Sequence, residues 1–281
     1  MKFVDIKNDI AFRKIFGNEY RKEVVISFLN AILVLQNDQK IVAVEILTPY
    51  HLPEVKGREI PNVSVKVKDQ SGKIYLVEIQ VAEADDFEKR VLYRATKNYS
   101  SQAERENIFE KFLPTLFIGI LSFEITQRPD YLSRHKILDV RTGENLISDI
   151  ELNFIELPKF HKEEKELQNL TDHWIYFLKN SEILDVVPES LNDLGLQIAY
   201  EDASKHNWSP AELEAYEIVQ SRDQDMKARW GFSTKKELRK ALSHEKEMIA
   251  RNFLSSGVRA EIVALNTGLS LDEVRKLQSE N

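Results

Sequence analysis

The chain has 281 residues, of which 42% are hydrophobic and 30% charged, as in a globular protein with one large domain or a domain and an appendage. Its formal net charge is -7 at pH 7. A protein that coats nucleic acid is usually basic, so any contact with DNA has to come from a local patch. The chain contains no cysteine, which excludes disulfides, thiolate catalysis and thiolate zinc sites.

No apolar run approaches the roughly 18 residues that a membrane-spanning helix needs. The N-terminal stretch MKFVDIKNDIAFRKIF is charged throughout and has no apolar signal region. The sequence therefore predicts a cytoplasmic protein that makes no contact with a membrane.

The first part of the chain predicts two helices. Apolar residues recur near helical spacing over residues 6–16, and Gly17 then resembles a helix C-cap. A second apolar stripe at helical spacing covers residues 24–32.

Strands are expected next. Residues 40–52 are rich in β-branched residues, and residues 61–81 predict two strands around the turn DQSG. A long helix follows Asp85-Asp86, which offers an N-cap, and the apolar run at 113–125 is typical of a buried strand. With further strands at 132–140 and 151–156, the order is two helices, three strands, one helix and three strands, which predicts an α/β or α+β sheet domain.

The composition changes near residue 160, where a highly charged helical region begins. We therefore expect a core domain over residues 1–160 and a helical region over residues 161–281. Residues 257–277 resemble a helix-turn-helix hairpin, with Thr267-Gly268 at the turn. The charges of this hairpin nearly balance, whereas helices that read DNA usually carry surplus cations, so helix packing or dimerisation is an equally open role.

The hairpin at residues 61–81 carries the residues that suggest chemistry. Glu78 and Gln80 lie two residues apart in a strand, so their side chains share one face, and Ser64 on the neighbouring strand could meet them. Hydrolysis of a phosphodiester needs carboxylates that hold a divalent cation, and a polar group that orients the attacking water. The six histidines show no metal-binding spacing such as H-x-x-x-H.

The blocks NDIAFRKIFG, VKDQSGKIYLVEIQV, FEKRVLYRATKNYSSQ and LPTLFIGILSF resemble, in order, the recurrent blocks of the PD-(D/E)XK nuclease family transposases, also called recombination-promoting nucleases. The tail IARNFLSSGVRAEIVALNTGLSLDEVRKL resembles that family as well, so the resemblance covers nearly the whole chain. It implies a restriction-endonuclease-like core, a mixed sheet with flanking helices, followed by the helical C-terminal region. It further implies cleavage of DNA with Mg²⁺ or Mn²⁺.

The resemblance also implies site residues. The E-x-Q element of the family falls on Glu78 and Gln80, where Gln80 stands at a position that is lysine in most of the wider superfamily. The family's metal-binding aspartate aligns with Ser64, so the catalytic set is Glu78, Gln80 and Ser64. The metal ligands would be Glu78 and Asp9, because an acid on the first helix often assists the metal in this superfamily.

Two nearby residues could compensate for Ser64 and Gln80. Asp69 has the opposite strand parity to Ser64 and lies beside the turn, where aspartate is favoured for local reasons. Lys66 shares the face of Ser64 and could supply the cation that is lost at Gln80.

The long helix after Asp86 carries a basic stripe at i, i+4 and i+7, formed by Arg90, Arg94 and Lys97. Such a stripe beside a nuclease site could bind DNA phosphates, or it could be a solvated face paired with Asp86 and Glu88. Gln102, further along the same helix, could reach the site and DNA or make a local polar contact.

Three functions are open at this point. The first is a metal-dependent DNA endonuclease. The second is a catalytically inactive homologue that binds DNA or a partner, and Ser64 favours it. The third is a helical interaction protein built on a nuclease core. A homodimer is compatible with each of these functions.

Overall fold

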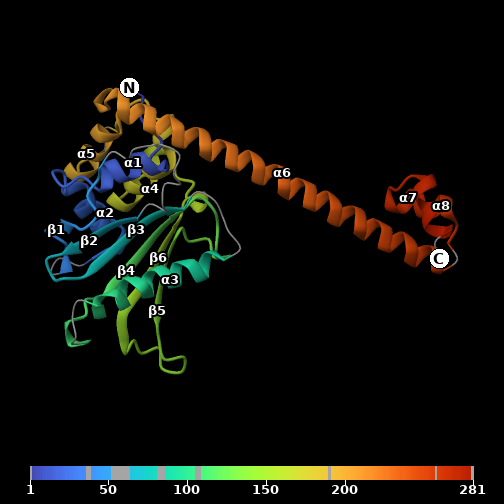
Figure 1. Ribbon diagram of the computed structural model, residues 1–281, viewed down its shortest axis with the longest axis horizontal. Helices are drawn as coiled ribbons and strands as arrows, with labels where there is room; N and C mark the ends of the chain where they lie inside the picture. Colours follow the sequence, from blue (N-terminus) through green and yellow to red (C-terminus); the bar gives the residue numbers. More distant parts are fainter. Residues whose placement is uncertain are drawn as a thin grey trace. The chain divides into compact units, whose positions relative to one another are not determined.

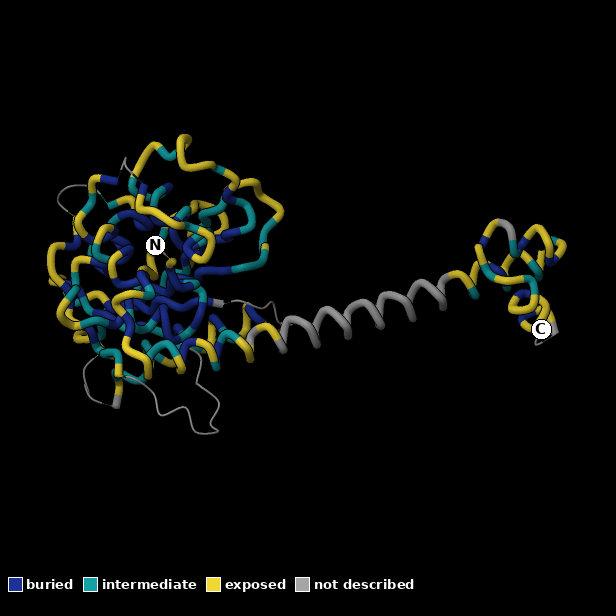
Figure 2. Tube along the Cα trace, turned by 90° about the horizontal axis from the view of Figure 1, so that it is seen from above, coloured by how far each residue is buried: buried dark blue, intermediate teal, exposed yellow. Residues whose placement is uncertain are grey.

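The computed structural model describes residues 2–35, 39–51, 64–80, 86–104, 109–188, 191–256 and 258–279. The side chains at 80, 104, 223, 225–245, 265 and 279 also lie outside the described part. The chain forms two compact units, Met1–Gln220 and Ser221–Asn281. Buried residues, dark blue in Figure 2, fill the interior of the first unit, and the second unit has a smaller cluster of its own.

The two expected N-terminal helices are confirmed. Helix α1 (Asp9–Phe16) begins after Asn8, whose side chain accepts a hydrogen bond from the backbone N–H of Ile10. It ends at Gly17, whose N–H donates to the Arg13 carbonyl oxygen over 2.8 Å. A Cβ at position 17 would lie 2.6 Å from that oxygen, which explains the glycine. Helix α2 (Glu23–Leu33) follows and buries the second apolar stripe.

The six strands form one mixed sheet, drawn in Figure 1, in the spatial order β1-β2-β3-β4-β6-β5. Strand β4 pairs in parallel with β3 and β6, and the other pairs are antiparallel. All seven residues of β4 are buried, as expected of an apolar strand covered on both faces. The strands are β1 (Val44–Ile46), β2 (Ser64–Asp69), β3 (Ile74–Gln80), β4 (Thr115–Leu121), β5 (Leu132–Ile137) and β6 (Ile147–Glu156).

The expected order of helices and strands is confirmed, and the bounds of several strands differ from the expected ones. Strand β1 has three residues within the expected range 40–52, and the N–H groups of Val42 and Ala43 donate to the Gln70 side chain. Strand β5 ends at Ile137, where the pairing with β6 shifts register, and β6 starts earlier than expected at Ile147.

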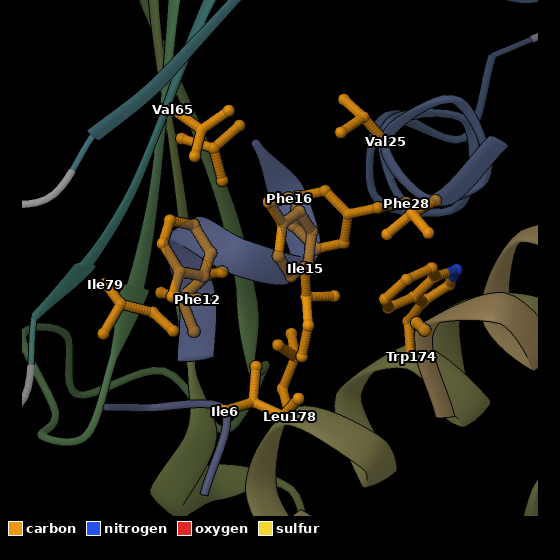
Figure 3. Close-up of a cluster of buried hydrophobic side chains, with 14 of the residues drawn as sticks. Ile6, Phe12, Ile15, Phe16, Val25, Phe28, Val65, Ile79, Trp174 and Leu178 are labelled. Atoms are coloured by element: carbon orange, nitrogen blue, oxygen red, sulfur yellow. The ribbon is translucent and has the colours of Figure 1, made fainter. Parts of the chain in front are cut away.

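Helices cover the two faces of the sheet unequally. The larger core lies against the face that carries Val65, Val77 and Ile79, and it receives α1, α2, α4 (Leu170–Asn180) and α5 (Leu194–Ala203). Figure 3 shows side chains of this core, with Trp174 beside Phe28 and Phe12 near Ile79. The Trp174 indole N–H donates to the Ser27 hydroxyl over 2.8 Å, which satisfies a fully buried polar group.

Helix α3 (Phe87–Ser100) lies along the opposite face, as Figure 1 shows. Its buried residues, Phe87, Val91 and Ala95, recur every four positions and pack against Leu76, Phe117 and Phe154 of the sheet. Short 3-10 helices follow among the described residues of the first unit: η2 (Ser101–Glu104), η3 (Phe109–Lys111), η4 (Leu157–Lys159), η5 (Glu164–Glu166), η6 (Ser181–Ile183) and η7 (Lys205–Asn207).

The change of composition near residue 160 coincides with the end of the last strand at Glu156. Helices α4 and α5 lie beyond this point, yet they pack into the same core as the sheet. The division into domains 1–160 and 161–281 stays a prediction.

Helix α6 (Pro210–Ser255) begins in the first unit and ends in the second. There α7 (Ala260–Thr267) and α8 (Leu271–Ser279) pack with its last turns around Ala250, Val263 and Val274. Gly268 has a φ of 67° and ends α7, so the turn uses a conformation that favours glycine. Among the described residues, no helix combines the length and the apolar character needed to span a membrane.

Glu156 ends β6 as a fully buried carboxylate. It accepts hydrogen bonds from the backbone N–H of Ile125 at 2.7 Å and from the Thr126 hydroxyl at 2.8 Å, and it pairs with the Lys159 ammonium at 2.8 Å. Burial opposes the ionisation of Glu156, but these bonds outweigh it and lower the pKa of the carboxyl below its usual value. Glu156 therefore ties the loop after β4 to the end of β6.

We expect Glu156→Gln to lower the free energy of unfolding by about 3 kcal/mol at pH 7, because Lys159 is left buried without its counter-ion. The stability from an acid with a lowered pKa is complete above its unfolded pKa, about 4.3, and is lost as the pH falls through the folded pKa. The difference between wild type and variant should thus shrink on acidification below about pH 4.

Urea unfolding at pH 7 and at acidic pH measures this effect, with the exposed Glu124→Gln as the control. A variant as stable as the wild type at pH 7 would contradict the role given to Glu156.

Candidate active site

The β2–β3 hairpin places Ser64 opposite Glu78. The register pairs these two residues, and on the other side it pairs Glu78 with Gly119 of β4. Directly opposite residues of an antiparallel pair project from the same face. The hydroxyl of Ser64 and the carboxylate of Glu78 therefore belong to neighbouring positions on one face, as strand parity predicted.

That face is the one covered by α3. Leu76 and Glu78 alternate with Val77 and Ile79, and the last two contribute to the core on the opposite side. Glu78 is 6% exposed. Burial of a carboxylate is costly unless another group pairs with it.

The wall beside Glu78 is apolar. Gly119 leaves room for aromatic rings, since a Cβ there would lie 3.0 Å from the Phe154 ring and 3.1 Å from the Phe117 ring. Phe87 of α3 packs against Phe154 with ring centroids 5.8 Å apart. These rings therefore surround the strand position that is paired with Glu78.

Arg94 of α3 forms the ion pair with Glu78, between its Nη1 and the Oε2 of the carboxylate. The side chains of the two residues are 22% and 8% exposed, respectively. Sequence reasoning assigned Arg94 to DNA phosphates and missed this pair. A usable signal was present, because Arg94 follows Val91 by three positions and so flanks the buried stripe of α3.

The charge of Glu78 depends on this partner. Burial raises the pKa of the carboxyl above its usual value, and the charge and hydrogen bond of Arg94 oppose that rise without cancelling it. Arg94 is thus the group that favours the charged form of Glu78 in a desolvated position.

The other two residues of the predicted basic stripe, Arg90 and Lys97, contact side chains that are close to them in the sequence. Arg90 pairs with Asp86 at 3.2 Å, the partner that the solvated alternative names, and the Lys97 ammonium lies 5.5 Å from the centre of the Tyr93 ring. Contact of Arg90, Arg94 and Lys97 with DNA stays a prediction.

Gln102 makes the local polar contact that was its alternative role. Its amide nitrogen donates to the Leu113 carbonyl oxygen over 2.9 Å, and its amide oxygen accepts from the Leu113 N–H over 2.7 Å. Gln102 therefore fixes η2 to the residues that lead into β4, and its contact with DNA stays a prediction.

Two other predicted site residues, Asp9 and Gln80, lie at the start of α1 and at the end of β3. Asp9 is half-buried at the start of α1, and the buried residues of α1 pack on the face of the sheet opposite to Glu78. Gln80 ends β3, where its backbone pairs with Leu121, and its side chain lies outside the described part. The roles given to Asp9 and Gln80 stay predictions.

Asp69 is a turn residue, as its local interpretation predicted. Its Oδ1 accepts from the Ser71 N–H at 2.7 Å and from the Lys73 N–H at 3.0 Å, and its Oδ2 accepts from the Tyr75 hydroxyl at 2.8 Å. These bonds occupy the carboxylate away from the face of Glu78. Lys66 lies opposite Leu76 and shares the face of Ser64, so its role as a relocated cation stays open.

The donors at Glu78 fit a divalent cation only under one condition. A carboxylate and a hydroxyl are hard oxygen ligands, and Mg²⁺ often takes one or two carboxylates with waters and substrate phosphates. Because Arg94 already neutralises Glu78, the charge of a cation bound there is compensated only when the guanidinium leaves the carboxylate. No group of three or more His, Cys, Asp or Glu side chains suited to a metal occurs within the described ranges.

Comparisons with known proteins give one result. No match was found among curated proteins, and none among solved structures. A family model described as PD-(D/E)XK nuclease family transposase matches residues 6–230, a span that contains α1, the whole sheet and α3. Nucleases of the PD-(D/E)XK type act on DNA and generally use divalent metal ions. On this match, the chain belongs to the PD-(D/E)XK nuclease family transposases.

Proposed function

We propose that this protein is a metal-dependent DNA endonuclease of the recombination-promoting type. One observation carries the proposal: Glu78 lies on β3 directly opposite Ser64 of β2, the residue that the resemblance aligns with the family's aspartate. When bound, Mg²⁺ or Mn²⁺ polarises a phosphoryl oxygen and lowers the pKa of the attacking water.

The residues of the chain have separate roles in this proposal. Glu78 is the carboxylate ligand in this proposal, and Ser64 contributes a neutral hydroxyl on the same face as Glu78. Asp9, the second acid that the resemblance implies, starts α1, whose buried residues pack on the other face of the sheet, so it supplies no charge at Glu78 here. Gln80 orients the attacking water through its amide. Phosphates of the DNA backbone are bound by residues of α3 and its extension, Arg90, Arg94, Lys97 and Gln102.

A second function is favoured by a specific observation. Ser64 is uncharged where the family has an acid, and Arg94 neutralises Glu78. A catalytically inactive homologue that binds DNA or a partner protein would need neither a second carboxylate nor a metal. A cytoplasmic location and a homodimer belong to both functions and rest on the sequence alone.

The endonuclease proposal predicts that the purified protein nicks supercoiled plasmid DNA in Mg²⁺ or Mn²⁺. EDTA should abolish nicking, and Glu78→Ala should reduce its rate by about 10²-fold or more, the usual cost of losing one electrostatic group at an active site. The exposed Glu144→Ala is the matched control and should nick as the wild type does.

Folded wild-type protein that shifts DNA but does not nick it in either metal would reject the endonuclease and support the inactive homologue. Equal nicking by Glu78→Ala would remove Glu78 from the site.

Ser64→Asp should raise the rate of nicking, since it adds a second carboxylate opposite Glu78 and improves charge compensation of the metal. We expect a gain of about 10²-fold, the size associated with one electrostatic group. Ser256→Asp, a change of the same type at an exposed position of the second unit, is the control. No gain in a folded Ser64→Asp protein that binds metal would contradict the assignment of Ser64 to the aspartate position.

A further inference from the structure

Arg94 and a divalent cation would use the same carboxylate. The Nη1 of Arg94 contacts the Oε2 of Glu78, and both side chains are largely removed from water. With one negative and one positive charge, the pair is neutral. A divalent cation added to this neutral pair would leave two uncompensated positive charges, since Ser64 supplies none of the negative charge of an aspartate.

We propose that Arg94 is a built-in competitor of the metal, which holds Glu78 until a divalent cation displaces the guanidinium. Arg94 is in this sense a positioning residue, because it acts through Glu78. The displaced guanidinium is then available for a phosphate of the DNA backbone, a ligand that arginine binds in a bidentate manner. Only this last step rests on the proposed endonuclease function, since the competition itself requires no cleavage.

The packing of α3 allows the exchange without movement of the helix. Phe87, Val91 and Ala95 hold α3 against the sheet, and the Asn98 amide donates to the buried Thr115 hydroxyl over 3.0 Å one turn beyond Arg94. The Arg94 side chain is the more exposed member of its pair, at 22%. A change of side-chain rotamer can therefore move the guanidinium toward solvent while the helix stays in place.

The competition sets the apparent affinity for metal. When only a fraction of the protein molecules is in the state that binds a ligand, the apparent dissociation constant equals the intrinsic one divided by that fraction. If Arg94 leaves Glu78 free a tenth of the time, removal of the guanidinium strengthens metal binding about tenfold. The binding of Mn²⁺ alone reports this effect without any cleavage.

The experiment measures Mn²⁺ binding to the full chain at pH 8 by titration calorimetry. Arg94→Gln should bind Mn²⁺ more tightly than the wild type, by the inverse of the fraction of molecules in which Glu78 is free of Arg94. Lys89→Gln removes the same charge from an exposed position of the same helix and should bind as the wild type does. The double variant Glu78→Gln/Arg94→Gln should lose the binding that Arg94→Gln gains, which places the metal at Glu78.

Circular dichroism establishes that each variant is folded. If Arg94→Gln does not fold, Arg94→Met removes the charge and keeps an unbranched side chain that can fill the space, and its Mn²⁺ affinity should still exceed that of the wild type. Unchanged or weaker Mn²⁺ binding by the folded variant would overturn the competition.

The two proposals fail in different ways. Plasmid nicking by the wild type with unchanged Mn²⁺ binding by Arg94→Gln would retain the endonuclease and reject the competition. Tighter Mn²⁺ binding by Arg94→Gln without nicking by any variant would support the competition and reject the endonuclease.

Discussion

The burial of the central parallel strands on both faces is the constraint on which the site depends. Strand β4 lies between β3 and β6, and helices cover both faces, so polar side chains on these strands have to find partners within the protein. Two carboxylates are buried there, and each has a cation: Glu78 pairs with Arg94, and Glu156 pairs with Lys159. Thr115, which is fully buried at the start of β4, accepts a hydrogen bond from Asn98.

This constraint also explains how α3 lies on the sheet. Its apolar stripe supplies most of the contact, but apolar packing by itself tolerates a range of helix positions. Arg94 and Asn98 are four residues apart, on one side of the helix, and each meets a buried polar group on a different strand. Together they select one position of α3 along the sheet, because any other position would leave Glu78 or Thr115 without a partner.

The same need for a partner allows two different cations to neutralise Glu78. A buried carboxylate needs a positive partner, and both a guanidinium and a divalent cation satisfy that need. In the competition proposed above, an acid at position 64 would let both be present, whereas the serine opposite Glu78 makes them alternatives. The endonuclease and the DNA- or partner-binding homologue therefore differ physically in which cation Glu78 holds when DNA arrives.

The sequence by itself determined the order of the helices and strands, the turn role of Asp69 and the pairing of Ser64 with Glu78. These features depend on local patterns, since strand alternation and a short turn fix the register of a hairpin. It did not reveal that Arg94 pairs with Glu78 or that Gln102 binds the Leu113 backbone. It also did not reveal that the first helix lies on the face of the sheet away from Glu78. Only the tertiary structure decided these points, because the position of a helix on a sheet follows from packing between separate elements, which no local period encodes.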